Sequence, residues 1–267
     1  MDPRRGSADP VLVDSHCHLD AAEFDEDRGA VKARALAAGV VAQVVPATHA
    51  EGWPGLRGTC IDGRGLYPAY GLHPVFLERH RPDHLRDLCS WLRDEPAVAI
   101  GECGLDHFVE GLDRVAQAEY FSAQLQLARE FDLPVIVHAR RAVDAVIAAI
   151  RRIGGLRGVV HSFSGSPEQA GQLWRQGFLL GLGGPVTYER ARRLRRLAAS
   201  MPLEHLLLET DAPDQPDSSL RGRRNEPAHV RTVCATIAGL RGITERELAA
   251  ATTANAVRLF GLTLDRA

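Results

Sequence analysis

Short apolar runs recur along the chain, and most of them are followed by a segment with helical spacing. The first run, Val11-Leu12-Val13, is rich in β-branched residues and precedes polar residues, as is typical of a buried strand. Runs of this kind predict strands at Val11–His18, Val41–Thr48, Leu66–His73, Ala97–Asp106, Pro134–Arg140, Gly158–Phe163, Phe178–Gly183 and His205–Thr210.

The segments between these strands carry the end signals of helices. Ser166 is a suitable N-cap and is followed by proline in the first turn. Thr244 and Glu247 have the spacing of a capping box. We predict helices at Asp25–Ala38, Pro82–Asp94, Asp113–Phe131, Arg141–Ile153, Pro167–Gln176, Tyr188–Ala199, Pro227–Leu240 and Thr244–Leu259.

The segment between Thr48 and Leu66 departs from this regularity because it holds too many glycines for a good helix. We expect a short or broken helix there. Eight strands that alternate with helices predict an α/β fold, a TIM (β/α)8 barrel with a shortened second βα unit. The alternative is a doubly wound open sheet, which would need a glycine-rich phosphate loop after an early strand, and none is present.

Composition agrees with one soluble domain. The chain has 267 residues, of which 45% are hydrophobic and 25% charged, and it has no apolar run long enough to span a membrane. We expect a disordered tail at residues 1–10 and a single domain at residues 11–267. Five scattered cysteines predict a reducing, cytoplasmic location. We expect a monomer, because no apolar surface stripe stands out in the sequence. The net charge of −2 argues against an extended basic surface for nucleic acid.

Candidate chemistry gathers at the carboxyl ends of the predicted strands, where barrel enzymes place their active sites. His16 and His18 are two residues apart, so in a strand both would face the same side and could bind one metal ion. The ends of other strands add Glu102, His138, His161 and Asp211, and also His73. Each of these polar groups would be costly to bury without a partner, and a shared metal centre would satisfy them together.

The motifs HCHLD, GLHP, GECGLD, VHAR, HSFSG, ETDAP and RRNEPAHV stand in the order seen in the TatD family of metal-dependent deoxyribonucleases, within the amidohydrolase superfamily. The resemblance runs from about Val11 to Phe260. It implies two divalent ions, Mg²⁺, Mn²⁺ or Zn²⁺, and hydrolysis of DNA phosphodiesters, commonly from strand ends in the 3′-to-5′ direction. His16, His18 and Asp211 would hold one ion and His138 and His161 the other, with Glu102 bridging.

Further residues are candidates for contact with substrate or for proton transfer. Asp211 could accept a proton from the attacking water while it binds a metal. His73 could contact a phosphate or act as an acid, although a role as a hydrogen-bonded turn residue before Pro74 is as plausible. Arg140 would face the same side as His138 and could bind a phosphate, although a surface salt bridge is the alternative. Arg224 and Asn225, close to the barrel top, are further candidates for substrate binding.

Two positions depart from the family pattern and leave the substrate open. His107 stands where the family usually has an aromatic residue, and Asp214–Asp217 replaces an aromatic and apolar stretch. A metal-dependent esterase or amidohydrolase, such as a D-aminoacyl-tRNA deacylase, is therefore the alternative to a nuclease that acts on DNA ends. A non-catalytic role is the third possibility, and the full ligand set speaks against it.

Overall fold

The computed structural model describes residues 10–61 and 63–264. Eight parallel strands pair in chain order. The backbone N–H of Ser15, just after β1, donates to the carbonyl of Leu208 in β8 at 2.9 Å and brings the two edges together. The predicted TIM barrel is thereby confirmed. The strands are β1 (Leu12–Asp14), β2 (Val40–Pro46), β3 (Leu66–Tyr70), β4 (Ala99–Asp106), β5 (Val135–Arg140), β6 (Gly158–Val160), β7 (Phe178–Leu182) and β8 (Leu206–Leu208).

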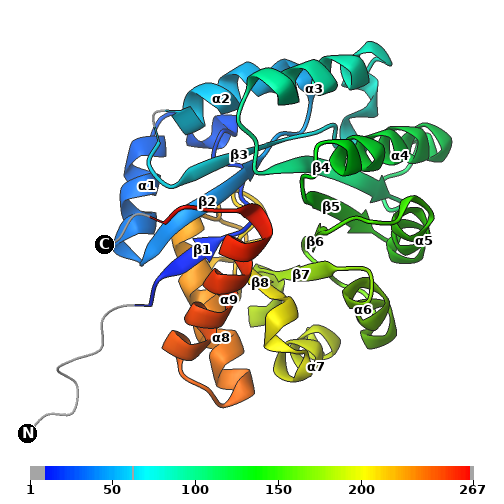
Figure 1. Cartoon of the computed structure of the whole chain (residues 1–267). Helices are drawn as coiled ribbons and strands as arrows, with labels where there is room; N and C mark the ends of the chain where they lie inside the picture. Colours follow the sequence, from blue (N-terminus) through cyan, green and yellow to red (C-terminus); the bar gives the residue numbers. More distant parts are fainter. Residues whose placement is uncertain (1–9, 62, 265–267) are drawn as a thin grey trace, which may run out of the picture.

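The helices form the outer layer around the strands (Figure 1). Their apolar faces and the outward faces of the strands build one buried cluster. A second cluster fills the barrel, and Leu259 and Phe260 of the last helix pack against it. The helices are α1 (Arg28–Ala37), α2 (Trp53–Ile61), α3 (Asp83–Asp94), α4 (Arg114–Glu130), α5 (Val143–Ile153), α6 (Pro167–Trp174), α7 (Arg192–Ser200), α8 (Val230–Arg241) and α9 (Glu245–Phe260).

The glycine-rich second unit forms a short but continuous helix, α2. Gly55 and Gly58 have no atoms within 4 Å of the place where a Cβ would lie, so they face open space. The helix is held instead by Trp53, whose indole N–H donates to Gly71 O at 3.2 Å and whose ring packs against Tyr70. Burial of an aromatic side chain thus compensates for poor helix propensity.

Several predicted strands are longer than those observed, most clearly the first. β1 ends at Asp14, so His16 and His18 lie in the loop beyond the strand. The Asp14 carboxylate fixes this loop, because it accepts hydrogen bonds from the backbone N–H groups of His16 and Thr210 at 3.2 and 3.0 Å. The two loops that follow β1 and β8 are therefore joined beneath the site.

Residues 1–9 of the expected tail lie outside the described residues, and Pro10 is buried. Within the two described ranges, no helix has the length and apolar character needed to cross a membrane.

Candidate metal centre

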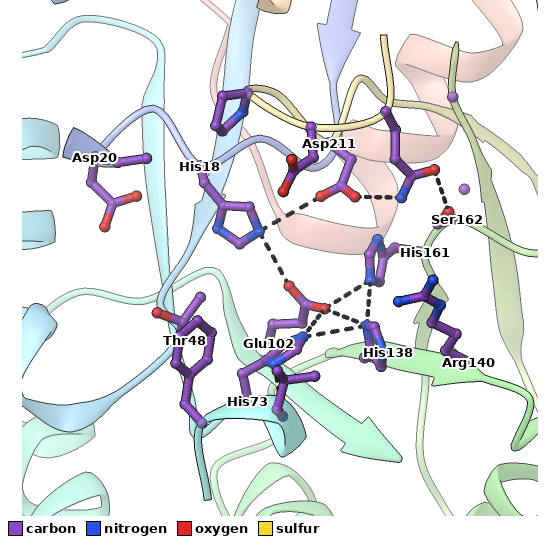
Figure 2. A pocket seen from close by; sticks show the side chains of 18 of the residues that line it. His18, Asp20, Thr48, His73, Glu102, His138, Arg140, His161, Ser162 and Asp211 are labelled. Atoms are coloured by element: carbon purple, nitrogen blue, oxygen red, sulfur yellow. Dashed lines mark hydrogen bonds and ion pairs between the residues drawn. The ribbon is translucent and has the colours of Figure 1, made fainter. Parts of the chain in front are cut away.

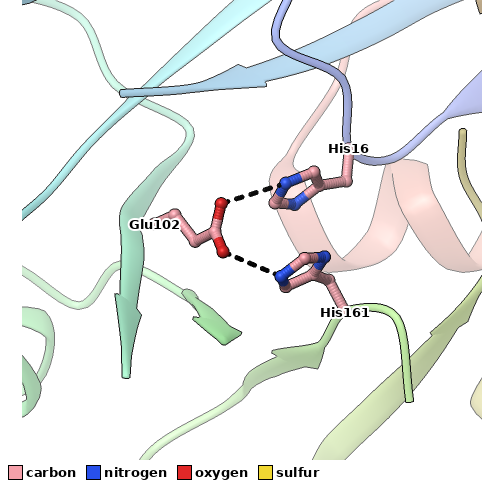
Figure 3. Close-up of side chains that lie close together, drawn as sticks. All are labelled: His16, Glu102 and His161. Atoms are coloured by element: carbon pink, nitrogen blue, oxygen red, sulfur yellow. Dashed lines mark ion pairs between the residues drawn. The ribbon is translucent and has the colours of Figure 1, made fainter. Parts of the chain in front are cut away.

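The Glu102 carboxylate on β4 lies at the centre of the carboxyl end of the barrel. It is buried and faces two groups of histidines, one with each oxygen (Figures 2 and 3). Oε2 lies 3.2 Å from His16 Nε2 and 3.3 Å from His18 Nε2. The same two nitrogens are 3.3 Å apart and lie 3.4 and 3.6 Å from Asp211 Oδ1. His16, His18 and Asp211 thus form one compact set of donor atoms.

The second carboxylate oxygen of Glu102 meets the other histidines. Oε1 lies 2.8 Å from His161 Nε2, 3.0 Å from His138 Nδ1 and 2.9 Å from His73 Nε2. His138 Nδ1 in turn lies 3.4 Å from His161 Nε2 and 3.3 Å from His73 Nε2. His73 therefore belongs to the cluster. The sequence alone did not decide between a role at the site and a role as a turn residue.

The donor set fits divalent metal ions. Two ligands about 2.1 Å from a tetrahedral ion lie about 3.4 Å apart, which matches the nitrogen-to-nitrogen distances of 3.3 and 3.4 Å within each set. Imidazole nitrogens mixed with carboxylate oxygens suit zinc and other transition metals. The six residues expected as ligands are brought together, and their potential ligand atoms fall into overlapping groups.

Stacking brings the two histidine sets together, and burial and charge shift the pKa values of His161 and Glu102. The rings of His16 and His161 are stacked, with centroids 3.9 Å apart and planes 6° from parallel, so the two sets lie side by side (Figure 3). Burial lowers the pKa of His161 to about 4. Burial alone would raise the pKa of Glu102, but the surrounding imidazoles hold it well below its usual range. Near pH 7 the centre therefore holds an anionic carboxylate at Glu102 and a neutral nitrogen donor at His161.

Asp106 supports His138 from behind, a role the sequence analysis missed. Its Oδ2 lies 2.9 Å from His138 Nε2, so the opposite ring nitrogen faces Glu102. Its Oδ1 accepts the backbone N–H groups of Phe108 and Val109 at 2.8 and 3.0 Å. Burial alone would lower the pKa of His138, but the hydrogen bonds to Asp106 and Glu102 raise it to about 9. Such carboxylate partners fix the orientation of metal-binding imidazoles.

Glu209 is a second buried acid that the sequence analysis did not select. Its Oε1 accepts the backbone N–H of Ser162 at 2.5 Å and lies 3.8 Å from His161 Nδ1. Its Oε2 has no hydrogen-bond partner among the described residues. Burial raises the pKa of Glu209 to about 8. The signal was present in the sequence, because Glu209 stands in the ETDAP motif at the end of β8.

Gln215 holds the Asp211 carboxylate. Its amide N–H₂ donates to Asp211 Oδ2, and its carbonyl accepts the Ser162 hydroxyl at 2.8 Å. Asp211 Oδ1 is thereby left facing His16 and His18, and Figure 2 shows its position relative to His18. Gln215 stands in one of the stretches that depart from the family pattern, so this contact could not be inferred from the motifs.

Of the four residues expected to bind substrate, His73 and Arg140 line the cavity and Arg224 and Asn225 do not. Arg224 forms ion pairs with Asp27 and Glu226 at 2.8 and 3.0 Å. The buried Asn225 amide donates to the carbonyls of Thr210 and Asp214 at 2.9 and 2.8 Å. The structure does not support a substrate contact for either, because their polar atoms are engaged within the protein.

The cluster forms the floor of an open cavity of about 1200 Å³. Its lining includes Arg140 and several carboxylates, of which Asp20 lies across the cluster from Arg140 (Figure 2). A space of this size accommodates a ligand well beyond a single phosphate group. The arrangement as a whole can hold metal ions at its floor and a larger substrate above them.

Comparison with known proteins places this architecture in a family. The model of the TatD related DNase family matches residues 13–261. The chain is 41% identical to "Uncharacterized metal-dependent hydrolase YjjV" of Escherichia coli K12 over 94% of this chain and 98% of that protein. It is 34% identical to "3'-5' ssDNA/RNA exonuclease TatD" of Klebsiella pneumoniae strain 342, over 94% and 98% of the two chains.

Structural comparison gives the same answer. The crystal structure of the TatD homologue YjjV from E. coli K12 superposes with a TM-score of 0.90, at 39% identity, over 94% of this chain and 98% of that one. The match therefore extends over the barrel and the loops that carry the cluster. The chain belongs to the TatD related DNase family and is a metal-dependent hydrolase.

Proposed function

We propose that this hydrolase uses two divalent metal ions to cleave phosphodiester bonds at the ends of DNA strands, in the manner of a 3′-to-5′ exonuclease. The observation that carries the proposal is the position of Glu102, which presents one carboxylate oxygen to each histidine set. His16, His18 and Asp211 would hold one ion and His138 and His161 the other. Such a pair of ions supplies an activated water and stabilises both the attacking and the leaving oxygen of a phosphodiester.

The protein side chains have distinct parts in this proposal. Asp211 is suited to accept the proton of the attacking water, because Gln215 fixes the orientation of its carboxylate. Arg140 lies beside His138 and His161, where its guanidinium can bind a phosphate oxygen (Figure 2). Burial lowers the pKa of His73, which argues against proton donation at neutral pH. Its Nδ1 accepts the backbone N–H of Val75 at 3.1 Å, so Nε2, which faces Glu102, is the atom that would contact a phosphate.

Two further observations support a nucleic acid substrate. The relative from K. pneumoniae carries the name of a single-stranded DNA and RNA exonuclease. The volume of the cavity exceeds that needed for one phosphate, which suits a nucleotide strand. The carboxylates in its lining would repel a polyanion that ran across the whole site. A strand that enters by one side and ends at the metal centre satisfies both. The cytoplasmic location and the monomeric state stay predictions.

The test is metal-resolved hydrolysis of labelled DNA. The protein is stripped with a chelator and supplied with Mg²⁺, Mn²⁺ or Zn²⁺ singly, together with single-stranded DNA labelled at its 5′ end, so that each shortened product remains visible. We expect stepwise release of nucleotides that stops in the Glu102→Ala variant. Absence of release with every metal, in protein that binds the ions, would reject the nuclease assignment.

One observation favours the alternative substrate class, an aminoacyl ester of transfer RNA. Asp20, Glu23 and Asp214 line the same side of the cavity and could bind the free amino group of an amino acid. The activated water would serve ester hydrolysis equally well. Release of free amino acid from D-aminoacylated transfer RNA, without release of nucleotides, would establish this function in place of the nuclease.

A further inference from the structure

We propose that Phe108, Arg140 and Arg141 form a platform that binds the single strand leading away from the metal centre. This inference rests on the proposed function and names the place where the substrate strand lies. The Arg140 guanidinium carbon is 3.7 Å and that of Arg141 is 4.6 Å from the centre of the Phe108 ring. Phe108 is 42% exposed, so a ligand can reach this residue from solvent.

The platform is continuous with the metal centre. Arg140 lines the central cavity and lies beside His138 and His161 (Figure 2). The Asp106 carboxylate that orients His138 also accepts the backbone N–H of Phe108. One acid therefore holds both a candidate metal ligand and the aromatic residue of the platform. A strand that ends at the metal centre would therefore pass Arg140 before it reaches Phe108.

The charges on the platform point to an anionic ligand. Across residues 10–61 and 63–264, no carboxylate forms an ion pair with Arg140 or Arg141. The other arginines that stack on phenylalanine differ in this respect. Arg224, over Phe24, is paired with two carboxylates, and Arg93, over Phe131, lies 4.0 Å from Glu130. Two unneutralised guanidinium groups on one ring repel each other, and a phosphate between them would remove that repulsion.

The opposite side of the cavity sets the direction of the strand. Asp20 lies there, across the metal centre from Arg140 (Figure 2), and Glu23, Asp25 and Asp214 also line the cavity, with Asp214 close to Glu23 and His18. The arginine of that side, Arg28, already donates to Asp25 at 2.6 Å and to the carbonyl of Leu19 at 2.8 Å. A polyanion is therefore repelled there and attracted on the Phe108 side. The strand leaves the metal centre over the platform, and its terminal unit lies at the acidic side.

An exposed aromatic ring next to arginines suits unpaired bases. A base of a single strand can extend the stack that Phe108 forms with the two guanidinium groups while its phosphates contact their N–H groups, whereas the bases of a duplex are covered by their neighbours. Beyond Arg141 a second hollow of about 840 Å³ continues along the surface. It carries carboxylates as well as arginines, so we limit the proposed binding surface to Phe108, Arg140 and Arg141.

The test is the binding of labelled deoxythymidylate oligomers, two and eight nucleotides long, to the chelator-treated protein, measured by fluorescence anisotropy. We expect Phe108→Ala to weaken binding of the octamer about tenfold, because stacking of one base has an effect of this order. The dinucleotide, which is too short to cover the platform, should bind nearly as it does to the wild type. Arg141→Ala should reduce the slope of log affinity against log salt by about 0.7, as expected for one lost phosphate contact on a single strand.

Arg93→Ala is the matched control, because Arg93 also stacks on a phenylalanine but lies on the outer helix α3. It should bind both oligomers as the wild type does. Equal affinity of the wild type and Phe108→Ala for the octamer would overturn the platform. The same holds if Phe108→Ala weakens binding of an abasic octamer as much as it weakens binding of the normal octamer, because the loss would then not depend on a stacked base. Hydrolysis of bis(4-nitrophenyl) phosphate by the metal-loaded wild type tests the proposed function separately. Failure of that reaction alongside a Phe108-dependent octamer affinity would reject the proposed function and support the platform.

Discussion

Asp106 and His138 form a carboxylate–imidazole pair, with Asp106 Oδ2 at 2.9 Å from His138 Nε2. The pair determines which ring nitrogen faces Glu102. We predict that Asp106→Asn weakens metal binding about 10- to 100-fold, the usual effect of removing such a partner. The measurement is competition with a chromophoric chelator. Unchanged affinity would show that His138 is oriented by other contacts or does not bind metal.

Asn225 and Arg224 should differ sharply in their effect on stability. Asn225→Ala removes the amide that donates to the carbonyls of Thr210 and Asp214, the first of them buried, so we expect a loss of about 2–3 kcal/mol in the free energy of unfolding. Arg224→Ala removes partly exposed ion pairs and should cost about 1 kcal/mol or less. Urea denaturation of both variants provides the comparison. Equal losses would contradict the assignment of Asn225 as the residue that holds the loop after β8.

Glu209 makes the stability of the metal-free protein depend on pH. Its pKa is raised by burial from 4.5 to about 8, so between these values the folded protein binds a proton that the unfolded chain releases. This contribution to stability is present at low pH and is lost as pH rises from 4.5 to 8. Its size is on the order of a few kcal/mol.

Glu209→Gln removes this titration and keeps the acceptor for Ser162 N–H. Between pH 5 and pH 8 the wild type should therefore lose more free energy of unfolding than the variant does. Chemical denaturation at both pH values gives this difference directly. A difference that stays constant would mean that Glu209 is already ionised in the folded protein at pH 5.

Two glycines should respond in opposite ways to substitution by alanine. A Cβ on Gly181 would lie 2.0 Å from Glu209 Oε2 and 3.2 Å from the His161 backbone, so Gly181→Ala must displace the Glu209 side chain. We expect a loss of about 2 kcal/mol or more. Gly58 on α2 faces open space, and Gly58→Ala should stabilise the protein by up to about 1 kcal/mol. Thermal unfolding of the two variants tests both signs.

The ends of the predicted strands were enough to locate the cluster, because parallel strands of a barrel end at the same face. His16, Glu102, His138 and His161 could be selected in this way although β1 is much shorter than predicted. Asp106 could have been found as well. It lies four residues after Glu102 on β4 and so faces the same side of the strand.

Other contacts could not be inferred from spacing along the chain. Asn225 looked like a substrate residue because its motif lies near the barrel top, whereas its role depends on carbonyl groups of residues 10 to 15 positions earlier. Gln215 reaches Asp211 only because the loop after β8 folds back on itself. Such contacts depend on loop conformation, which the hydrophobic pattern does not determine.

The most direct test of the account is the number of metal ions that depend on Glu102. Chelator-treated wild type and Glu102→Ala would each be saturated with Zn²⁺ or Mn²⁺, freed of excess ion and measured by mass spectrometry, with circular dichroism to confirm folding. If Glu102 bridges two sites, the wild type retains two ions per chain, and the folded variant loses affinity for both. A wild type that saturates at one ion, or a variant that still retains two, would contradict the bridging role on which the proposed mechanism rests.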